Sequence, residues 1–325
     1  MPTEMTLLPP QDVESRKMVD LLMKLAPQEG YNLTSLASVR FLRSNRPLAR
    51  TPVLYDPGMV IVCQGSKRGY FGDKTYVYDR QHYLAVSVPV PFVMETEASP
   101  ECPLLAIYLH LDFPMAAELL IQIEKFQALQ DAPVQPPVAP ESMMSSPLDD
   151  ALKATVLHFL EVMSQPLEAA ILGPTLLREL YFRILTGAQG HAMRAALAMH
   201  GQFGKIGKAL RHIHAAYASP LDLTELAGKA GMSVPTFHSH FKAITRTSPM
   251  QYVKSTRLHQ ARLLMVRQGM TAAVASQSVG YESPSQFNRE FKRLFGLPPA
   301  EETRRMRDNF AVPPAHAASE FVSSH

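Results

Sequence analysis

The fold is decided by the stretch VASQSVGYESPSQFNREFKRLFGLPP, residues 274–299, together with an earlier copy, LAGKAGMSVPTFHSHFKAITRTSP, residues 226–249. Both copies contain Phe-x-x-x-Phe-Lys, and in both a proline follows the second phenylalanine by eight residues. Each copy predicts a helix, a tight turn at a glycine and a second helix. One copy alone would also suit an ordinary helical hairpin, whereas two copies indicate a duplicated helix–turn–helix unit.

Capping signals mark where these helices begin and end. Asp222 and Glu225 form a capping box, in which side-chain oxygens accept backbone N–H groups of the first turn. Gly231 and Gly280 suit the left-handed conformation that the turns require. Side-chain caps are also expected at the starts of the other helices, at Ser233, Thr271 and Ser283.

A long helix is predicted between the two units, over residues 249–268. Its apolar residues recur at helical spacing and should face inward, at Tyr252, Leu258, Ala261, Leu264 and Met265. About 18 residues at a rise of 1.5 Å give a rod of roughly 27 Å. Such a rod can hold the two units, about 221–245 and 271–295, roughly one DNA turn apart.

The second helix of each unit has a small, polar and basic outer face. Its two phenylalanines, four residues apart, must face inward. The residues left outside are Val234, Pro235, His238, Ser239 and Lys242 in the first copy and Pro284, Ser285, Asn288, Arg289 and Lys292 in the second. Arg and Asn side chains hydrogen-bond to base edges and Lys to phosphate, so these are the candidate DNA-binding residues.

Basic residues gather in this part of the chain. Residues 201–310 hold 16 Lys and Arg against 7 Asp and Glu, a net charge of +9, so the rest carries −6 of the total of +3. A solvated helical face would explain the bases but not the scarcity of compensating acids. The imbalance favours a polyanionic partner, and double-stranded promoter DNA fits it.

These motifs resemble the AraC/XylS transcription regulators. The resemblance covers about residues 205–307 and rests on Leu226-Ala227, Gly231-Met232-Ser233, Arg257-Leu258, Ala261-Arg262-Leu263-Leu264, Val279-Gly280-Tyr281-Glu282-Ser283 and residues 287–296. It implies two helix–turn–helix subdomains joined by the middle helix, with both recognition helices in successive segments of the major groove.

Two positions depart from the family pattern. Arg246 stands where the first copy usually has glycine, and we expect it to disturb the turn after the first recognition helix and to add a phosphate contact. Glu302 stands where the last helix usually has an aromatic residue, and we expect it to loosen that helix.

The first 200 residues predict a different architecture. Short β-rich runs separated by turn residues occupy about 33–112, at the spacing of a small barrel or sandwich. A helical period follows over 114–218, interrupted by a Pro- and Ser-rich loop at 131–147. An amphipathic helix is expected at 11–26.

The predicted fold class is therefore α+β. Residues 1–200 are expected to form an N-terminal cupin-like β-barrel with helices, which binds an effector or dimerises. Residues 201–310 are expected to form an all-α double helix–turn–helix DNA-binding domain. A disordered tail should follow at 311–325.

Residues 10–200 resemble the N-terminal domain of one subgroup of the same family, most clearly over residues 60–68. The resemblance implies a domain that binds a small-molecule effector or makes a homodimer contact, and a regulator that acts on RNA polymerase. Candidate effector-binding residues are Gln64, Lys67, Arg68, Tyr76 and Tyr78. A solvated strand end for the two cations, or barrel core for the two tyrosines, would explain them equally, and the sequence leaves these alternatives open.

A metal-dependent enzyme is the alternative function for a cupin-like barrel. Such a site needs two or three His and a carboxylate on one face, but His82 and His110 stand in separate runs with no His-x-His pair. Because no Ser/His/Asp arrangement or phosphate-binding glycine loop stands out either, no enzyme, metal or cofactor is predicted. The alternative that remains is a cupin-type enzyme with an accessory nucleic-acid-binding domain.

Cys63 and Cys102 are too few for a disulfide framework and lack the spacing of a zinc site. Either could sense oxidants or electrophiles as a thiolate, although free cysteine is more often a small buried apolar residue. The chain starts without a signal-peptide pattern, and no apolar run approaches the roughly 18 residues of a membrane span. We therefore expect a cytoplasmic transcription regulator, an activator, with no membrane partner.

Overall fold

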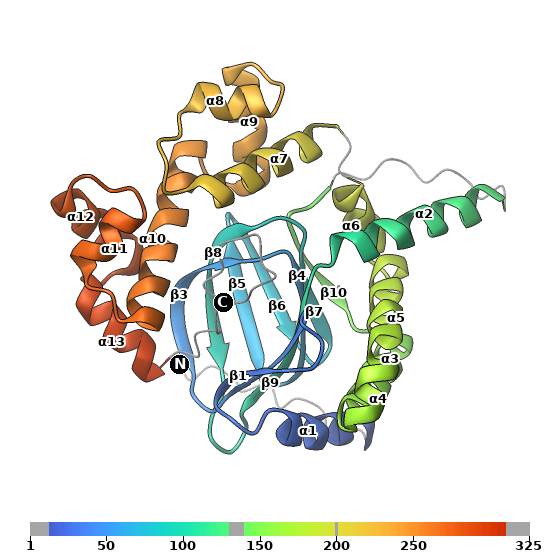
Figure 1. Ribbon diagram of the computed structural model, residues 1–325. Coiled ribbons are helices and arrows are strands. Elements are labelled where there is room, and N and C mark those ends of the chain that lie inside the picture. Colours follow the sequence, from blue (N-terminus) through green and yellow to red (C-terminus); the bar gives the residue numbers. More distant parts are fainter. Residues whose placement is uncertain (1–12, 130–139, 199–200, 310–325) are drawn as a thin grey trace, which may run out of the picture.

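The computed structural model describes residues 13–129, 140–198 and 201–309 (Figure 1). Its centre is a curled antiparallel sheet, a half-barrel, built from β1 (Gly30–Leu33), β2 (Val39–Ser44), β3 (Leu48–Tyr55), β4 (Gly58–Gln64), β5 (Ser66–Phe71), β6 (Lys74–Asp79), β7 (His82–Val86), β8 (Val90–Glu97), β9 (Leu104–His110) and β10 (Met143–Pro147). The strand order is β1-β2-β9-β4-β7-β6-β5-β8-β3, with β10 paired to β7. β1 and β3 are thus the two ends of this path.

The sheet is buried on both faces, and alternate residues of one strand serve different cores. In β4, Met59 and Ile61 pack in the cluster that joins the sheet to its covering helices. Val60 and Val62 point the other way, into a cluster that the sheet shares with the first helix–turn–helix unit. A strand buried on both sides reads as a continuous apolar run rather than as an alternation.

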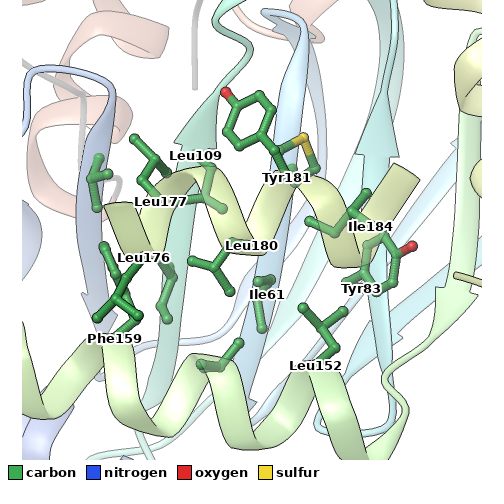
Figure 2. Close-up of a cluster of buried hydrophobic side chains, with 14 of the residues drawn as sticks. Ile61, Tyr83, Leu109, Leu152, Phe159, Leu176, Leu177, Leu180, Tyr181 and Ile184 are labelled. Atoms are coloured by element: carbon green, nitrogen blue, oxygen red, sulfur yellow. The ribbon is translucent and has the colours of Figure 1, made fainter. Parts of the chain in front are cut away.

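Helices cover the outer face of the half-barrel (Figure 1). They are α1 (Val13–Leu25), α2 (Phe113–Leu129), α3 (Asp150–Met163), α4 (Pro166–Ile171), α5 (Gly173–Thr186) and α6 (Gly190–Leu197). Figure 2 shows side chains of both α3 (Leu152, Phe159) and α5 (Leu180) pointing toward the sheet, where Ile61 and Leu109 lie. The helical period expected over 114–218 is confirmed here, since the apolar residues at helical spacing after Leu152 and after Leu177 are buried.

The remaining helices form the C-terminal part. The first unit comprises α7 (Gly201–Ala216), α8 (Leu223–Lys229) and α9 (Val234–Thr245), and the second α11 (Ala272–Ser278), α12 (Pro284–Phe295) and α13 (Pro299–Asn309). α10 (Pro249–Gln268) joins them, with the bounds that the sequence predicted. Leu258 is buried as expected, whereas Leu264 is only partly buried.

The α+β fold class is confirmed, and strands β2 to β9 lie within the expected β-rich region at about 33–112. One expectation was wrong: residues 143–147 of the supposed loop form β10, because Met143 and Met144 are buried where this strand pairs with β7. Residues 131–139 and the tail at 311–325 lie outside the described residues.

Candidate DNA-binding face and effector face

The two helices predicted to be recognition helices, α9 and α12, have the same pattern of burial. Phe237 and Phe241 are fully buried in α9, and Phe287 and Phe291 are buried in α12. Nine of the ten candidate DNA-binding residues are exposed, and the tenth, Val234, is partly buried. The two phenylalanines thus turn each candidate face outward, as the spacing predicted.

The predicted caps are present at three of four helix starts. The Asp222 carboxylate accepts the N–H of Glu225, Thr271 accepts that of Val274 and Ser283 accepts that of Gln286. Ser233 occupies the N-cap position of α9, but its hydroxyl donates to Oγ1 of Thr236 at 2.8 Å instead of accepting a backbone N–H.

The turn after α9 keeps its geometry in spite of Arg246. This residue has a φ of 58° and is the only non-glycine residue with positive φ among those described. Its N–H donates to the carbonyl of Lys242, which ends the helix. The expected disturbance of the turn was therefore wrong. The side chain of Arg246 lies beside Gly72 in the β5–β6 turn. A Cβ atom at Gly72 would lie 3.5 Å from Cγ of Arg246.

The first end of α10 is attached to the half-barrel through Tyr252. This tyrosine is fully buried, and its hydroxyl donates to the carbonyl of Pro89 at 2.9 Å. The Nε2 atom of His214 lies 2.8 Å from the same hydroxyl. Burial lowers the pKa of His214 to about 3, so this imidazole is neutral and donates its Nε2–H to the tyrosine oxygen.

The second end of α10 is attached through Arg262, whose side chain is fully buried. Its Nη1 donates to the carboxylate of Glu302 at 3.1 Å, and its Nη2 donates to the carbonyl of Pro52 in β3 at 2.9 Å. Arg305 also donates to Glu302, at 2.8 and 2.9 Å. Glu302 therefore fastens the last helix, and the expectation that it loosens α13 was wrong.

The candidate effector residues divide among four places. Lys67 and Tyr78 are buried on the inner face of the half-barrel, where burial lowers the pKa of Lys67 to about 7. Arg68 is partly exposed and is paired with Glu95 and Glu97 at 3.1 and 2.7 Å.

The other two candidates lie outside this inner face. The amide of Gln64 donates to the carbonyl of Pro103 at 3.0 Å. Tyr76 lines a cleft of about 360 Å³ between the half-barrel and the first unit, together with Lys74, His240 and Arg246. The five residues therefore do not form one site.

One residue of this inner face was missed by the sequence analysis. Arg40 in β2 is 2% exposed, and its buried Nε atom has no hydrogen-bond partner among the described residues. It pairs across the ladder with Tyr108 of β9, whose ring is also buried. A buried polar atom without a partner is costly unless something compensates it. An arginine inside a strand of apolar residues, Val39 to Leu42, was the only signal in the sequence.

His82 and His110, the two histidines considered as metal ligands, each lie beside one aspartate. Nδ1 of His82 is 3.3 Å from Asp79, and Nδ1 of His110 is 3.6 Å from Asp56. Among the described residues, no three His, Cys, Asp or Glu side chains gather as metal ligands. Cys63 is buried, which raises the pKa of its thiol to about 12, whereas Cys102 is exposed. No described helix has the length and apolarity needed to cross a membrane.

Comparison with known proteins relates both parts of the chain to one kind of protein. The family described as "AraC-type transcriptional regulator N-terminus" matches residues 35–192, and the helix–turn–helix domain family matches residues 226–305. The chain is 35% identical over 82 residues to the RCS-specific HTH-type transcriptional activator RclR of Escherichia coli K12, covering 25% of this chain and 29% of the relative. It is 32% identical over 96 residues to the MmsAB operon regulatory protein of Pseudomonas aeruginosa, covering 30% of each.

These matches span only about a third of the length of the curated relatives. The solved structure of an apo ToxT point variant from Vibrio cholerae has a TM-score of 0.54 at 10% identity, covering 84% of this chain and 99% of that one. Wild-type ToxT with a bound unsaturated fatty acid has a TM-score of 0.53 at 11% identity, covering 81% and 94%. The likeness to ToxT thus concerns the fold.

Proposed function

The chain belongs to the AraC/XylS family of transcriptional regulators, and from this premise we propose that it is a sequence-specific activator that responds to a small-molecule effector. Its helix–turn–helix domain binds DNA. In the proposal, α9 and α12 each read a segment of the major groove, and the half-barrel holds the effector. The division at about residue 200 and the homodimer and RNA polymerase contacts remain part of the same proposal.

The observation that carries DNA reading is the matched exposure of the two recognition helices. Each is a 12-residue helix with buried phenylalanines and an outer face open to solvent. Asn288 and Arg289 in α12 suit base edges, and Lys242 and Lys292 suit phosphates. The test is selection of duplexes from a random library by the full chain. We expect a long, asymmetric consensus from each protomer, whereas recovery of unrelated sequences would reject the proposal.

For the effector, we propose an acid with an apolar body. Two buried basic residues on the inner face, Arg40 and Lys67, support this choice, since an anion placed against them stabilises their charged forms. Their surroundings are aromatic, with Tyr55, Tyr78 and Tyr108 buried nearby. ToxT, which shares the fold, has been solved with an unsaturated fatty acid and with (E)-4-(8-methylnaphthalen-1-yl)but-3-enoic acid.

Thermal unfolding with octanoate and with 1-octanol, probes of equal chain length, tests this choice. A ligand that binds only the folded protein raises Tm, and we expect octanoate to do so much more than the alcohol. Arg40→Leu should abolish the difference. Arg68→Leu is the matched control, because this arginine faces outward and already pairs with Glu95 and Glu97. Equal shifts from both probes would exclude an acid-specific site.

The alternative function, a metal-dependent enzyme, predicts a different result. Metal analysis of the purified full chain should then find iron or zinc in a stoichiometric amount. Sensing by a thiol stays a proposal for Cys102, the exposed cysteine. Burial and the raised pKa of Cys63 keep its thiolate scarce at neutral pH.

A further inference from the structure

Two hydrogen bonds fasten the middle helix α10 to the half-barrel. Near its first end, Tyr252 donates to the carbonyl of Pro89 in the loop before β8. Ten residues later, Arg262 donates to the carbonyl of Pro52 in β3. At 1.5 Å per residue these two points lie about 15 Å apart along the helix. A rigid rod held at two points cannot pivot, whereas one held at a single point can.

The second point is on an edge strand. β3 pairs with β8 on one side and ends the path of the sheet. Carbonyl groups along such an edge have no ladder partner from a further strand, and a proline is tolerated there because it has no N–H to donate. The guanidinium of Arg262 donates a hydrogen bond to the Pro52 carbonyl, which a further strand would otherwise have bound.

Arg262 also joins the pieces of the second unit. It donates to Glu302 of α13, and its guanidinium lies 4.1 Å from the ring centroid of Phe295, the last residue of α12. His259, one helical turn earlier, packs edge-on against the same ring at 5.2 Å. Leu263 and Leu54 form a small apolar cluster beside this contact. One planar side chain thus links α10, α12, α13 and β3.

The charge of Arg262 persists in this buried place. Burial lowers its pKa to about 10, against the opposing effect of Glu302. The guanidinium is therefore protonated at neutral pH, and the neutral His259, whose pKa burial and Arg262 lower, does not compete for the carboxylate as a cation. A lysine could not replace Arg262, because one ammonium lacks the planar fork that reaches Glu302 and Pro52 together.

We propose that Arg262, clamped by Glu302, is the positioning residue that fixes the second recognition helix relative to the half-barrel. The first unit is held independently, by Tyr252 and by the hydroxyl of Ser142, which donates to the carbonyl of Ile244 at 2.7 Å. Two further hydrogen bonds join α13 to the half-barrel, from Arg305 to the Thr51 hydroxyl at 3.5 Å and from Arg46 to the carbonyl of Asp308. Without Arg262, α10 loses its hydrogen bond to β3 and α12 loses its stacked guanidinium, so the second unit is loosened while the first stays held. A movement of β3 would be transmitted to α12 through Arg262. This role of Arg262 is separate from the proposed DNA binding and does not require DNA to be bound.

Distances between spin labels on the full-length protein, measured by pulsed electron–electron double resonance, test the proposal. The exposed Cys102 carries the barrel label, because the buried Cys63 does not react. A second label at Arg293→Cys reports on α12, and in a separate protein Thr236→Cys reports on α9; both positions are exposed. The wild-type background should give one narrow distribution for each pair.

The decisive variant removes both charges, as Arg262→Met with Glu302→Leu. Replacing a buried ion pair by apolar residues of similar volume often leaves stability unchanged, and a methionine still packs on Phe295. We expect Tm to stay close to wild type, the distribution to Arg293→Cys to broaden or shift and that to Thr236→Cys to stay narrow. Arg262→Lys should have the same effect on the two distributions, which keeps the test valid if the double variant unfolds.

A control variant removes a cation that does not touch the half-barrel. Lys254 of α10 donates to Glu290 of α12 at 2.8 Å in a partly buried ion pair, and Lys254→Met should leave both distributions unchanged. Three results would overturn the proposal: an unchanged Arg293→Cys distribution in the folded Arg262 variants, equal broadening of both pairs, or a broad wild-type distribution to α12.

Discussion

Arg246 and Gly296 hold the same place in the two units. Each follows a recognition helix, each has positive φ, 58° and 83°, and each N–H donates to the carbonyl of the lysine four residues earlier, Lys242 or Lys292. The duplicated sequence thus keeps the same backbone turn where one copy has lost its glycine. The arginine gains a contact with the half-barrel, at Gly72, that a glycine could not make.

The strain of this turn can be measured by comparing Arg246→Gly with Arg246→Ala in the full chain. Both variants lose the side chain beside Gly72, but only glycine adopts the left-handed conformation without steric cost. We expect the glycine variant to be more stable than the alanine variant by about 1 kcal/mol, measured by urea unfolding. Equal stability would mean that the turn relaxes to negative φ when the arginine is removed.

The two kinds of DNA contact should separate by mutation. Asn288→Ala and Arg289→Ala should each cost about 1–3 kcal/mol of binding free energy and relax base preference at particular positions. Lys242→Ala and Lys292→Ala should weaken binding to all sequences alike and lower the salt slope by about one unit. Titrations of selected and scrambled duplexes at several salt concentrations distinguish the two. An Arg289→Ala variant with unchanged preference would show that α12 does not face the bases.

Acid should destabilise the protein through His214. The pKa of this buried imidazole is lowered from 6.5 to about 3, so the unfolded chain takes up its proton first as the pH falls. Stability is therefore intact above pH 6.5 and falls by about 1.4 kcal/mol per pH unit between pH 6.5 and 3.

His214→Gln keeps a donor for Tyr252 but does not titrate. Urea unfolding at pH 7.5, 6 and 5 should show a shallower loss for this variant, by roughly 2 kcal/mol at pH 5. The variant retains a residual slope from His259, whose pKa is also lowered by burial. Parallel curves for the two proteins would mean that His214 is solvated in the folded state.

The C-terminal helices could be predicted because their signals are local. The caps at Asp222, Thr271 and Ser283, the glycine turns and the paired phenylalanines each act within a few residues, so the bounds of α10 could be derived from sequence. The strands were harder. β10 is a polar-looking segment whose place is set by its pairing with β7, more than fifty residues away.

The contacts that join the two parts could not be predicted from sequence. Arg262 meets Pro52 from 210 residues away, and Tyr252 meets Pro89 from 163 residues away. From the sequence alone, Glu302 was only a departure from the family pattern that we expected to loosen the last helix. Its partner, Arg262, is brought to it by the fold. Arg40 was missed for the same reason, because burial of a single cation depends on the curl of the whole sheet.

Whether one chain reads DNA with both of its units is measured by hydroxyl-radical footprinting of the full chain on a selected duplex. If both units bind the major groove, each protomer protects two segments about one helical turn, 34 Å, apart on one face of the DNA. Arg289→Ala should remove the protection of one segment and leave the other. A single protected segment of about ten base pairs for each protomer, unchanged by Arg289→Ala, would contradict reading by both units.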